Sequence, residues 1–392
     1  VAKHMTSGDD PAVSRITIIF AAFFGHALAG GGIFTRIPDI QLALSLNEAV
    51  LGVALTVASV GGLVANLAAG RVVAAIGTKP LMVWGTPALA LSSAAVALAP
   101  GLPLLFVALL VMGTCFSLVN VAMNVEADRI EAATGRRIMN RCHGIWSVGM
   151  LIAALIGVGA RAAMVSAAMH LLLVVPVIIV LCLATLRHLN PSPLAPGDPV
   201  KRPGIALPSR RTIVLMLFAI SAPIAQSGTQ NWSVIFMRDM FSAPDWIDTL
   251  SLPAFLIAMA LGRLFADGWT ARFGPVRVAF VQTLIALLGT ALVVMSPGVA
   301  PALIGFLLMG AGTAVLFPLM ISAAARSGDR PAAESVSAVI LSTGLVMLMA
   351  PAVMGWIAET QGLRVAFAAL GLPMLMTLAL IRMAAPSRAA PV

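Results

Sequence analysis

Two pairs of amide side chains stand four residues apart inside long apolar stretches: Asn120 with Asn124, and Gln226 with Gln230. Residues four apart lie on one face of a helix, so each pair places a polar patch on an apolar wall. Amides donate and accept hydrogen bonds, as hydroxyl groups do. Because polar side chains are costly inside a bilayer, each pair is a candidate binding site for a hydroxyl-rich ligand.

Four further side chains extend this candidate binding site. Asn231 and Trp232 directly follow Gln230, and His143 and Trp146 open the fifth apolar stretch. The two indole rings offer flat surfaces for stacking on a sugar face or a drug ring. The alternative is structural: interhelical amide bonds contribute about 0.6 kcal/mol on average and join helices, and Trp232 anchors a helix end.

Titratable groups within the apolar stretches are few, and His26 lies farthest from either end of its stretch. An imidazole with an ordinary pKa near 6.5 changes charge at physiological pH, so His26 is our candidate for proton coupling, ahead of His143. The competing interpretation is a neutral His26 bonded to a neighbouring helix. Glu48 and Glu126, at the ends of their stretches, are interpreted as solvated carboxylates.

Arg263 is a cation within the eighth apolar stretch. One turn separates it from Asp267, so we expect the two to form an ion pair. The alternative is that Arg263 binds an anionic solute.

The elements that position these side chains are membrane-spanning helices. Hydrophobic residues make up 60% of the chain and charged residues 10%, against about 45–50% and about 25% in soluble domains. A helix needs about 20 apolar residues to cross a bilayer. Twelve such stretches lie near residues 15–34, 49–69, 80–99, 102–125, 142–160, 164–186, 212–237, 248–266, 276–296, 300–325, 335–357 and 363–384.

The net charge of +9 is arranged for membrane orientation rather than for nucleic-acid binding. With the N-terminus inside, nineteen Lys and Arg residues fall in cytoplasmic segments and four fall outside, as the positive-inside rule requires. Both termini are then cytoplasmic. A cleaved signal peptide ending near residues 27–29 is the alternative, but it would leave the 212–237 stretch without a partner in the repeat described next.

An internal repeat divides the chain. Met112-Gly113 and Met309-Gly310 lie 197 positions apart, as do Gly77 and Gly274. We expect six-helix bundles at 1–188 and 212–392, joined by a Pro- and Arg-rich cytoplasmic linker at 189–211. Parallel repeats of this kind occur in secondary transporters, with the substrate site between the halves. The charged segment 126–141 is expected to be a solvated surface helix.

This arrangement resembles the major facilitator superfamily. The loop Gly70-Arg71 to Gly77-Thr78-Lys79 is similar to the superfamily's signature after span two, although Ala74 stands where that signature has an Asp. Several short motifs are similar to the branch that contains fucose permease and rhizopine-transporter relatives. They are Arg36-Ile37-Pro38, Met123-Asn124, Met139-Asn140, His143-Gly144 with Trp146, Asn231-Trp232, and Arg238-Asp239.

The resemblance implies a bacterial inner-membrane protein, a monomer, with both bundles around a central cavity. The amide pairs would then face each other across the seam between the bundles. It also implies a cytoplasmic gate formed by Arg71, Lys79, Asp267 and Arg272. In fucose-permease-like proteins an acid used in proton coupling occupies the position of Asn120, and two acids in related proteins match Gln226 and Asn231. Amides cannot titrate, so the resemblance supports a polar binding pocket more strongly than it supports coupling of transport to protons.

These features predict a secondary transporter, or a facilitator, of a small sugar-like solute that works by alternating access, with coupling to protons left open. The alternative is a multidrug or metabolite exporter of the same superfamily, with the 21 Met residues supplying an adaptable pocket. An enzyme is not expected, because no nucleophile elbow, zinc-protease helix or phosphate loop is present in the sequence. We expect no cofactor and no metal site.

Overall fold

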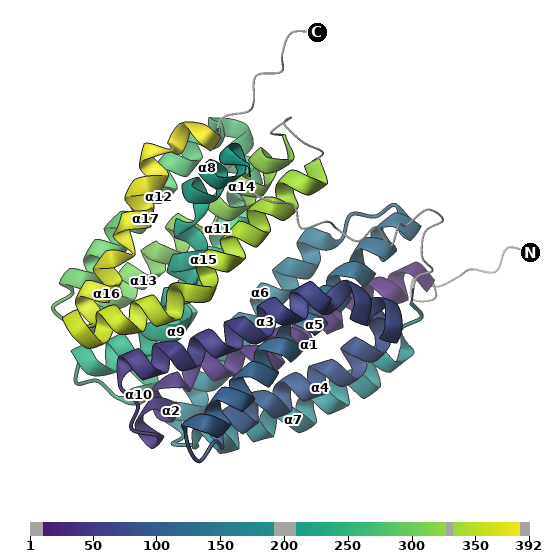
Figure 1. The fold of residues 1–392 in the computed structure, drawn as a ribbon, viewed down its shortest axis with the longest axis horizontal. Coiled ribbons are helices and arrows are strands. Elements are labelled where there is room, and N and C mark those ends of the chain that lie inside the picture. The colour runs from purple at the N-terminus through teal and green to yellow at the C-terminus, as the bar shows by residue number, and fades with distance from the viewer. Residues whose placement is uncertain (1–10, 192–208, 327–331, 385–392) are drawn as a thin grey trace, which may run out of the picture. The chain divides into compact units, whose positions relative to one another are not determined.

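The computed structural model describes residues 11–191, 209–326 and 332–384, and most of these residues are helical. The chain divides into two units (Figure 1). Unit 1 comprises Val1–Leu44 and Val57–Arg202, and unit 2 comprises Ser45–Thr56 and Pro203–Val392. Most of the predicted linker, residues 192–208, lies outside the described residues.

Unit 1 is built around its first helix, α1 (Pro11–Gly31), which packs against α4, α5, α6 and α7. Its small residues allow this, because α1 carries Gly25, Gly30 and Gly31 among buried alanines. The other elements are η1 (Gly32–Thr35), α2 (Ile37–Ala43), α3 (Glu48–Ile76), α4 (Thr78–Ala97), α5 (Leu102–Thr134), α6 (Met139–Ala162), α7 (Ala167–Ala184) and η2 (Leu186–His188). The first residues of α3, up to Thr56, belong to unit 2.

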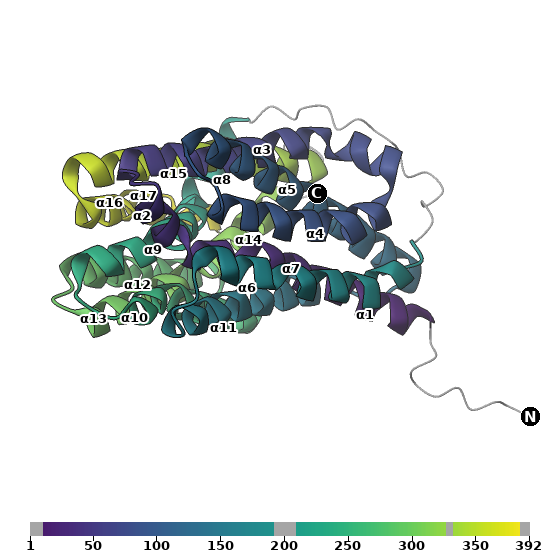
Figure 2. The ribbon, with the colours of Figure 1, turned by 90° about the horizontal axis from the view of Figure 1, so that it is seen from below.

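Unit 2 has α9 (Ser221–Met240) in the corresponding role, packed against α11, α13 and α15. Figure 2 shows α12 beside α13, and the contacts between these two helices are extensive. The remaining elements are α8 (Arg210–Ala219), α10 (Asp245–Thr249), α11 (Ser251–Phe273), α12 (Pro275–Met295), α13 (Val299–Thr313), α14 (Leu316–Ala325), α15 (Ala332–Gln361), α16 (Leu363–Ala369), α17 (Gly371–Ala379) and η3 (Ile381–Ala384).

All twelve predicted spans have a counterpart among the described helices. Ten helices are long and apolar enough to cross a membrane by length and composition. The pair α8–α9 forms an eleventh span that is bent by 45°, and Leu363–Ala379 is a shorter apolar segment at the twelfth position. The predicted all-α, twelve-helix membrane fold is therefore confirmed.

Four span interruptions occur just before a proline. Helices restart at Ser221, Ser251, Leu316 and Gly371, and in each case a proline follows two residues later, at Pro223, Pro253, Pro318 and Pro373. A proline ring clashes with the carbonyl four residues back, but it is tolerated in the first turn of a helix. Pro351, in contrast, lies inside the continuous helix α15.

The 197-residue repeat is visible in the backbone of both units. Gly113 of α5 lies against the carbonyl oxygen of Ala58 of α3, and Gly310 of α13 lies against that of Phe255 of α11. Adding 197 to 58 and 113 gives 255 and 310, so equivalent residues make equivalent contacts. A side chain at either glycine would meet backbone, which explains why both positions carry glycine.

Candidate functional site

The amide pair of unit 1 is joined along one face of α5. The Asn124 side-chain nitrogen donates to the backbone carbonyl of Asn120 at 2.8 Å and to its side-chain oxygen at 3.2 Å. Both residues are half-buried. The Asn120 NH₂ group and the Asn124 side-chain oxygen have no partner among the described residues. The pair therefore offers both donors and an acceptor to a ligand.

The amides of unit 2 form a half-buried stripe along α9. Gln226, Ser227, Gln230 and Asn231 share this face, because residues three and four apart are neighbours on a helix. Asn231 donates to the backbone carbonyl of Ser227 at 3.0 Å and to its hydroxyl at 3.2 Å. Gln226 and Gln230 make no hydrogen bond to any residue that the structure describes. Both are free to bind a solute.

Trp232 lies on the opposite face of α9 and is fully buried, at 0% exposure. The outer edge of its ring is close to Gly355 of α15. This burial favours the anchoring interpretation of Trp232 over a stacking role. The sequence alone does not separate the two, because Trp232 is adjacent to the amides in the chain while pointing about 100° away from Asn231 on the helix.

His26 of α1 is bonded through both ring nitrogens. Its Nε2 lies 3.0 Å from the Phe116 carbonyl oxygen, and its Nδ1 accepts the Trp146 indole N–H at 3.1 Å. A carbonyl only accepts, so the ring proton is on Nε2 and the imidazole is neutral. The ring is 0% exposed. This geometry favours the interpretation of His26 as a buried neutral link between helices over the interpretation as a proton carrier.

The two aromatic candidates on α6 differ in exposure. Trp146 is half-buried, so part of its ring remains available. His143 is exposed, and its ring meets Phe23 of α1 edge-on with centroids 5.5 Å apart.

The residues expected in a cytoplasmic gate lie near the ends of helices: Arg71 near the end of α3, Lys79 at the start of α4, and Asp267 and Arg272 near the end of α11. Arg71 and Arg272 are exposed and Lys79 is half-buried. The Arg272 guanidinium lies 5.1 Å from the centre of the Phe273 ring. No ion pair of these three cations is present in the described part of the chain. The Asp267 side chain lies outside what the structure describes, and so does its expected pairing with Arg263.

Glu126 corrects one prediction. We expected a solvated carboxylate, but Glu126 is 0% exposed because α5 continues past the predicted span end to Thr134. Its Oε2 accepts the Thr78 hydroxyl at 2.6 Å and lies 4.0 Å from an Arg129 guanidinium nitrogen. The expected solvated helix at 126–141 is not a separate element: α5 continues to Thr134 with Ile130 buried, and α6 begins at Met139, while Arg136 and Arg137 between them are exposed.

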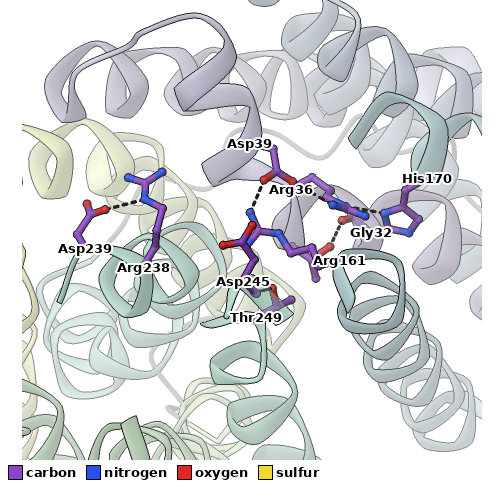
Figure 3. Close-up of polar contacts among 10 residues, drawn as sticks. Gly32, Arg36, Asp39, Arg161, His170, Arg238, Asp239, Asp245 and Thr249 are labelled. Atoms are coloured by element: carbon purple, nitrogen blue, oxygen red, sulfur yellow. Dashed lines mark hydrogen bonds and ion pairs between the residues drawn. The ribbon is translucent and has the colours of Figure 1, made fainter. Parts of the chain in front are cut away.

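A polar cluster that the sequence analysis did not predict lies at the end of unit 1 opposite to Glu126 and Thr78 (Figure 3). Arg36 donates to Asp39 at 3.1 Å and, through Nε, to His170 Nδ1 at 3.0 Å. Arg161 of α6 donates to the other Asp39 oxygen. Both arginines are buried, and burial lowers the pKa of Arg36 while the bond to Asp39 opposes that shift. The sequence analysis identified Arg36-Ile37-Pro38 as a motif, but it did not connect Arg36 to Arg161 and His170, which are 125 and 134 positions away.

Twelve apolar spans among the described residues, in two repeated units and with polar stripes on α5 and α9, define a multi-pass membrane protein of the transporter class. The family model of the Major Facilitator Superfamily matches residues 19–253, more than half of the chain. The chain therefore belongs to this superfamily and is one of its transporters.

Curated relatives agree with this family. An uncharacterized transporter, y4wD, of Sinorhizobium fredii is 27% identical, covering 90% of this chain and 94% of the relative. The membrane protein MosC of Rhizobium meliloti is 27% identical over 89% of this chain and 84% of its own length.

Solved structures share the fold at lower identity. The nucleoside transporter NupG (D323A mutant) matches with a TM-score of 0.77 and 14% identity, covering 94% of this chain and 99% of that one. The fucose:proton symporter FucP (N162A) of E. coli matches with a TM-score of 0.65 and 17% identity, covering 96% of this chain and 100% of that one. At these identities the likeness shows the fold alone.

Proposed function

We propose that this transporter moves a small, neutral, hydroxyl-rich solute across the bacterial inner membrane by alternating access. The observation that carries this proposal is the pair Gln226 and Gln230, two half-buried amides on α9 without a partner among the described residues. An unsatisfied amide inside a membrane span is costly, and a hydroxyl-rich ligand satisfies its donors and acceptor together.

The amides of α5 and α9 support a neutral solute. The half-buried amide groups along these two helices carry no charge. Two proteins of similar fold, a nucleoside transporter and a fucose:proton symporter, take cargoes that carry hydroxyl groups. A sugar or a nucleoside is therefore the class of solute that we expect.

Coupling to protons through His26 is not favoured in this proposal. Protonating Nδ1 would place a second N–H against the Trp146 indole N–H, so the Trp146 bond would have to break. We propose a facilitator, or a carrier coupled through a group other than His26.

A ligand screen on purified protein tests the proposal. A ligand that binds only the folded state raises its stability by RT ln(1 + [L]/Kd), about 2.7 kcal/mol at 100 times Kd. Thermal shifts are measured with sugars, polyols, nucleosides, sugar acids and lipophilic cations. A shift with a neutral sugar or nucleoside that Gln226→Leu abolishes supports the proposal. A shift confined to lipophilic cations contradicts it and favours drug export.

The matched control for this screen is Gln361→Leu. Gln361 is exposed at the end of α15, so the same substitution there removes an amide far along the chain from α9. We expect Gln361→Leu to keep the ligand shift of the unaltered protein. Loss of the shift in both variants would show that Gln226 has no special part in binding.

A further inference from the structure

Asn66 is an exposed amide within the membrane-spanning helix α3. Its side chain makes no hydrogen bond to any residue that the structure describes. The bulky exposed side chains of this part of α3 are Val60, Val64 and Leu67, which share another face. At 3.6 residues per turn, Val64 points about 160° away from Asn66. Asn66 is therefore exposed on a side of α3 away from its exposed aliphatic side chains.

Helices α3 and α5 of unit 1 lie in contact and run parallel. Gly113 of α5 lies against the carbonyl of Ala58 of α3. Four residues further along both helices, a Cβ at Gly62 would lie 3.0 Å from the hydroxyl oxygen of Ser117. The same step along each helix leads from one contact to the next, so the two helices run in the same direction.

Asn66 and Asn120 both follow this second contact by about one turn. Asn66 is four residues beyond Gly62, and Asn120 is three residues beyond Ser117, so the two differ by about 1.5 Å in height along the axes. Four residues rotate a side chain about 40° past a full turn, and three leave it about 60° short of one. In parallel helices, these opposite rotations bring both amides to the same side of the pair.

The polar groups at this place retain hydrogen-bonding capacity. The Ser117 hydroxyl is half-buried, and neither it nor the Asn66 amide has a partner among the described residues. The Asn120 NH₂ group donates to none of those residues either. Polar groups inside a membrane span are costly unless they meet partners. The α3–α5 pair therefore offers two level amides and a hydroxyl to a polar ligand.

We propose that Asn66 binds the transported solute together with Asn120, and that the two amides select a solute with two adjacent hydroxyl groups. This inference rests on the proposed function and adds α3 to the helices that bind the solute. Each amide both donates and accepts, so two level amides match the vicinal diol of a sugar or a ribose. A site that hydrogen-bonds a hydroxyl discriminates strongly against the analogue without it.

Thiol labelling tests the placement of Asn66 without any solute. Asn66→Cys and Leu67→Cys are each made with the three native cysteines replaced by Ala, and broken membranes are treated with a charged maleimide. The reaction requires a thiolate, which forms in water and not in lipid. We expect Asn66→Cys to react roughly tenfold faster than Leu67→Cys. Equal rates, or a faster reaction of Leu67→Cys, would overturn the placement.

Binding affinities test the contact with the solute. Thermal-shift titration with the solute from the ligand screen gives the Kd of the unaltered protein, Asn66→Leu, Asn120→Leu and the double variant. We expect each single change to raise Kd about tenfold, and the double change to raise it by less than the product of the two. Asn190→Leu is the matched control, because Asn190 is exposed after η2 and should leave Kd unchanged. Independent, multiplicative effects contradict a shared diol.

Gln226→Leu separates this inference from the proposed function. A Kd that Gln226→Leu raises and Asn66→Leu leaves unchanged keeps the proposed function and contradicts the role of Asn66.

A deoxy analogue of the solute tests selection. The unaltered protein should bind the diol more tightly than the deoxy analogue, and Asn66→Leu should reduce that preference. A merely structural role of Asn66 would weaken both ligands equally, so an unchanged preference contradicts the proposal.

Discussion

The Trp146 indole N–H donates to Nδ1 of His26 at 3.1 Å, which links α6 to α1 inside unit 1. The other nitrogen of the same ring reaches the Phe116 carbonyl of α5. One imidazole therefore joins three helices and fixes the orientation of the half-buried Trp146 ring. If Trp146 contacts the solute, His26 acts by positioning that ring.

His26→Gln should retain transport, because a glutamine amide accepts from Trp146 and donates to the Phe116 carbonyl as the imidazole does. His26→Phe should weaken solute binding and lower the melting temperature, since it removes the bond to the Phe116 carbonyl and leaves the Trp146 indole N–H without its acceptor, a loss of about 1–3 kcal/mol. Uptake and Tm are measured for both. A His26→Gln protein that still exchanges solute but loses pH-driven accumulation would show instead that His26 carries the proton.

The side chains of Glu126 and Thr78 should contribute to the stability of the protein jointly, through the hydrogen bond between them. Glu126→Leu and Thr78→Val each remove one partner of the 2.6 Å bond between α5 and α4, and we expect each to destabilise the protein by about 1–3 kcal/mol. The double variant should cost less than the sum of the two single changes. Thermal unfolding of all four proteins gives the coupling energy, and strict additivity would contradict a direct interaction.

Gly310→Val should be destabilising because its side chain would meet the Phe255 carbonyl on the neighbouring helix. Overpacking of this kind costs about 1–3 kcal/mol. Gly344→Val is the control, since a Cβ at Gly344 of α15 meets nothing within 4 Å. The comparison is made by Tm in detergent, and equal Tm values for the two variants would show that the α11–α13 contact tolerates a side chain.

Apolar length and the repeat were sufficient to predict the twelve spans, because crossing a bilayer imposes a minimum run of apolar residues. The apolar-length signal ended too early at Glu126. Charged residues continue helix α5 beyond the predicted span, and the buried face of that helix remains packed. Spacing of four residues predicted the Asn120–Asn124 contact. The Arg36–His170 bond was not predictable, since tertiary packing brings together residues 134 positions apart.

Orientation in the membrane is testable at two exposed connections of unit 1. Arg137 lies between α5 and α6 and should be cytoplasmic, whereas Met164, which is 92% exposed between α6 and α7, should be on the outside. Arg137→Cys and Met164→Cys are made with Cys115, Cys142 and Cys182 replaced by Ala. A membrane-impermeant maleimide added to intact cells should label only Met164→Cys. Labelling of Arg137→Cys alone would reverse the predicted topology.

Counterflow of radiolabelled neutral sugars and nucleosides in proteoliposomes measures carrier activity without assuming a coupling ion. With the solute found in the ligand screen, we predict counterflow by the unaltered protein and by the exposed-residue control Gln361→Leu. Asn120→Leu and Gln226→Leu should each reduce it at least tenfold, the equivalent of about 1.4 kcal/mol of binding energy. Full counterflow in both variants, or its absence for every neutral hydroxylated solute, would contradict the proposed carrier.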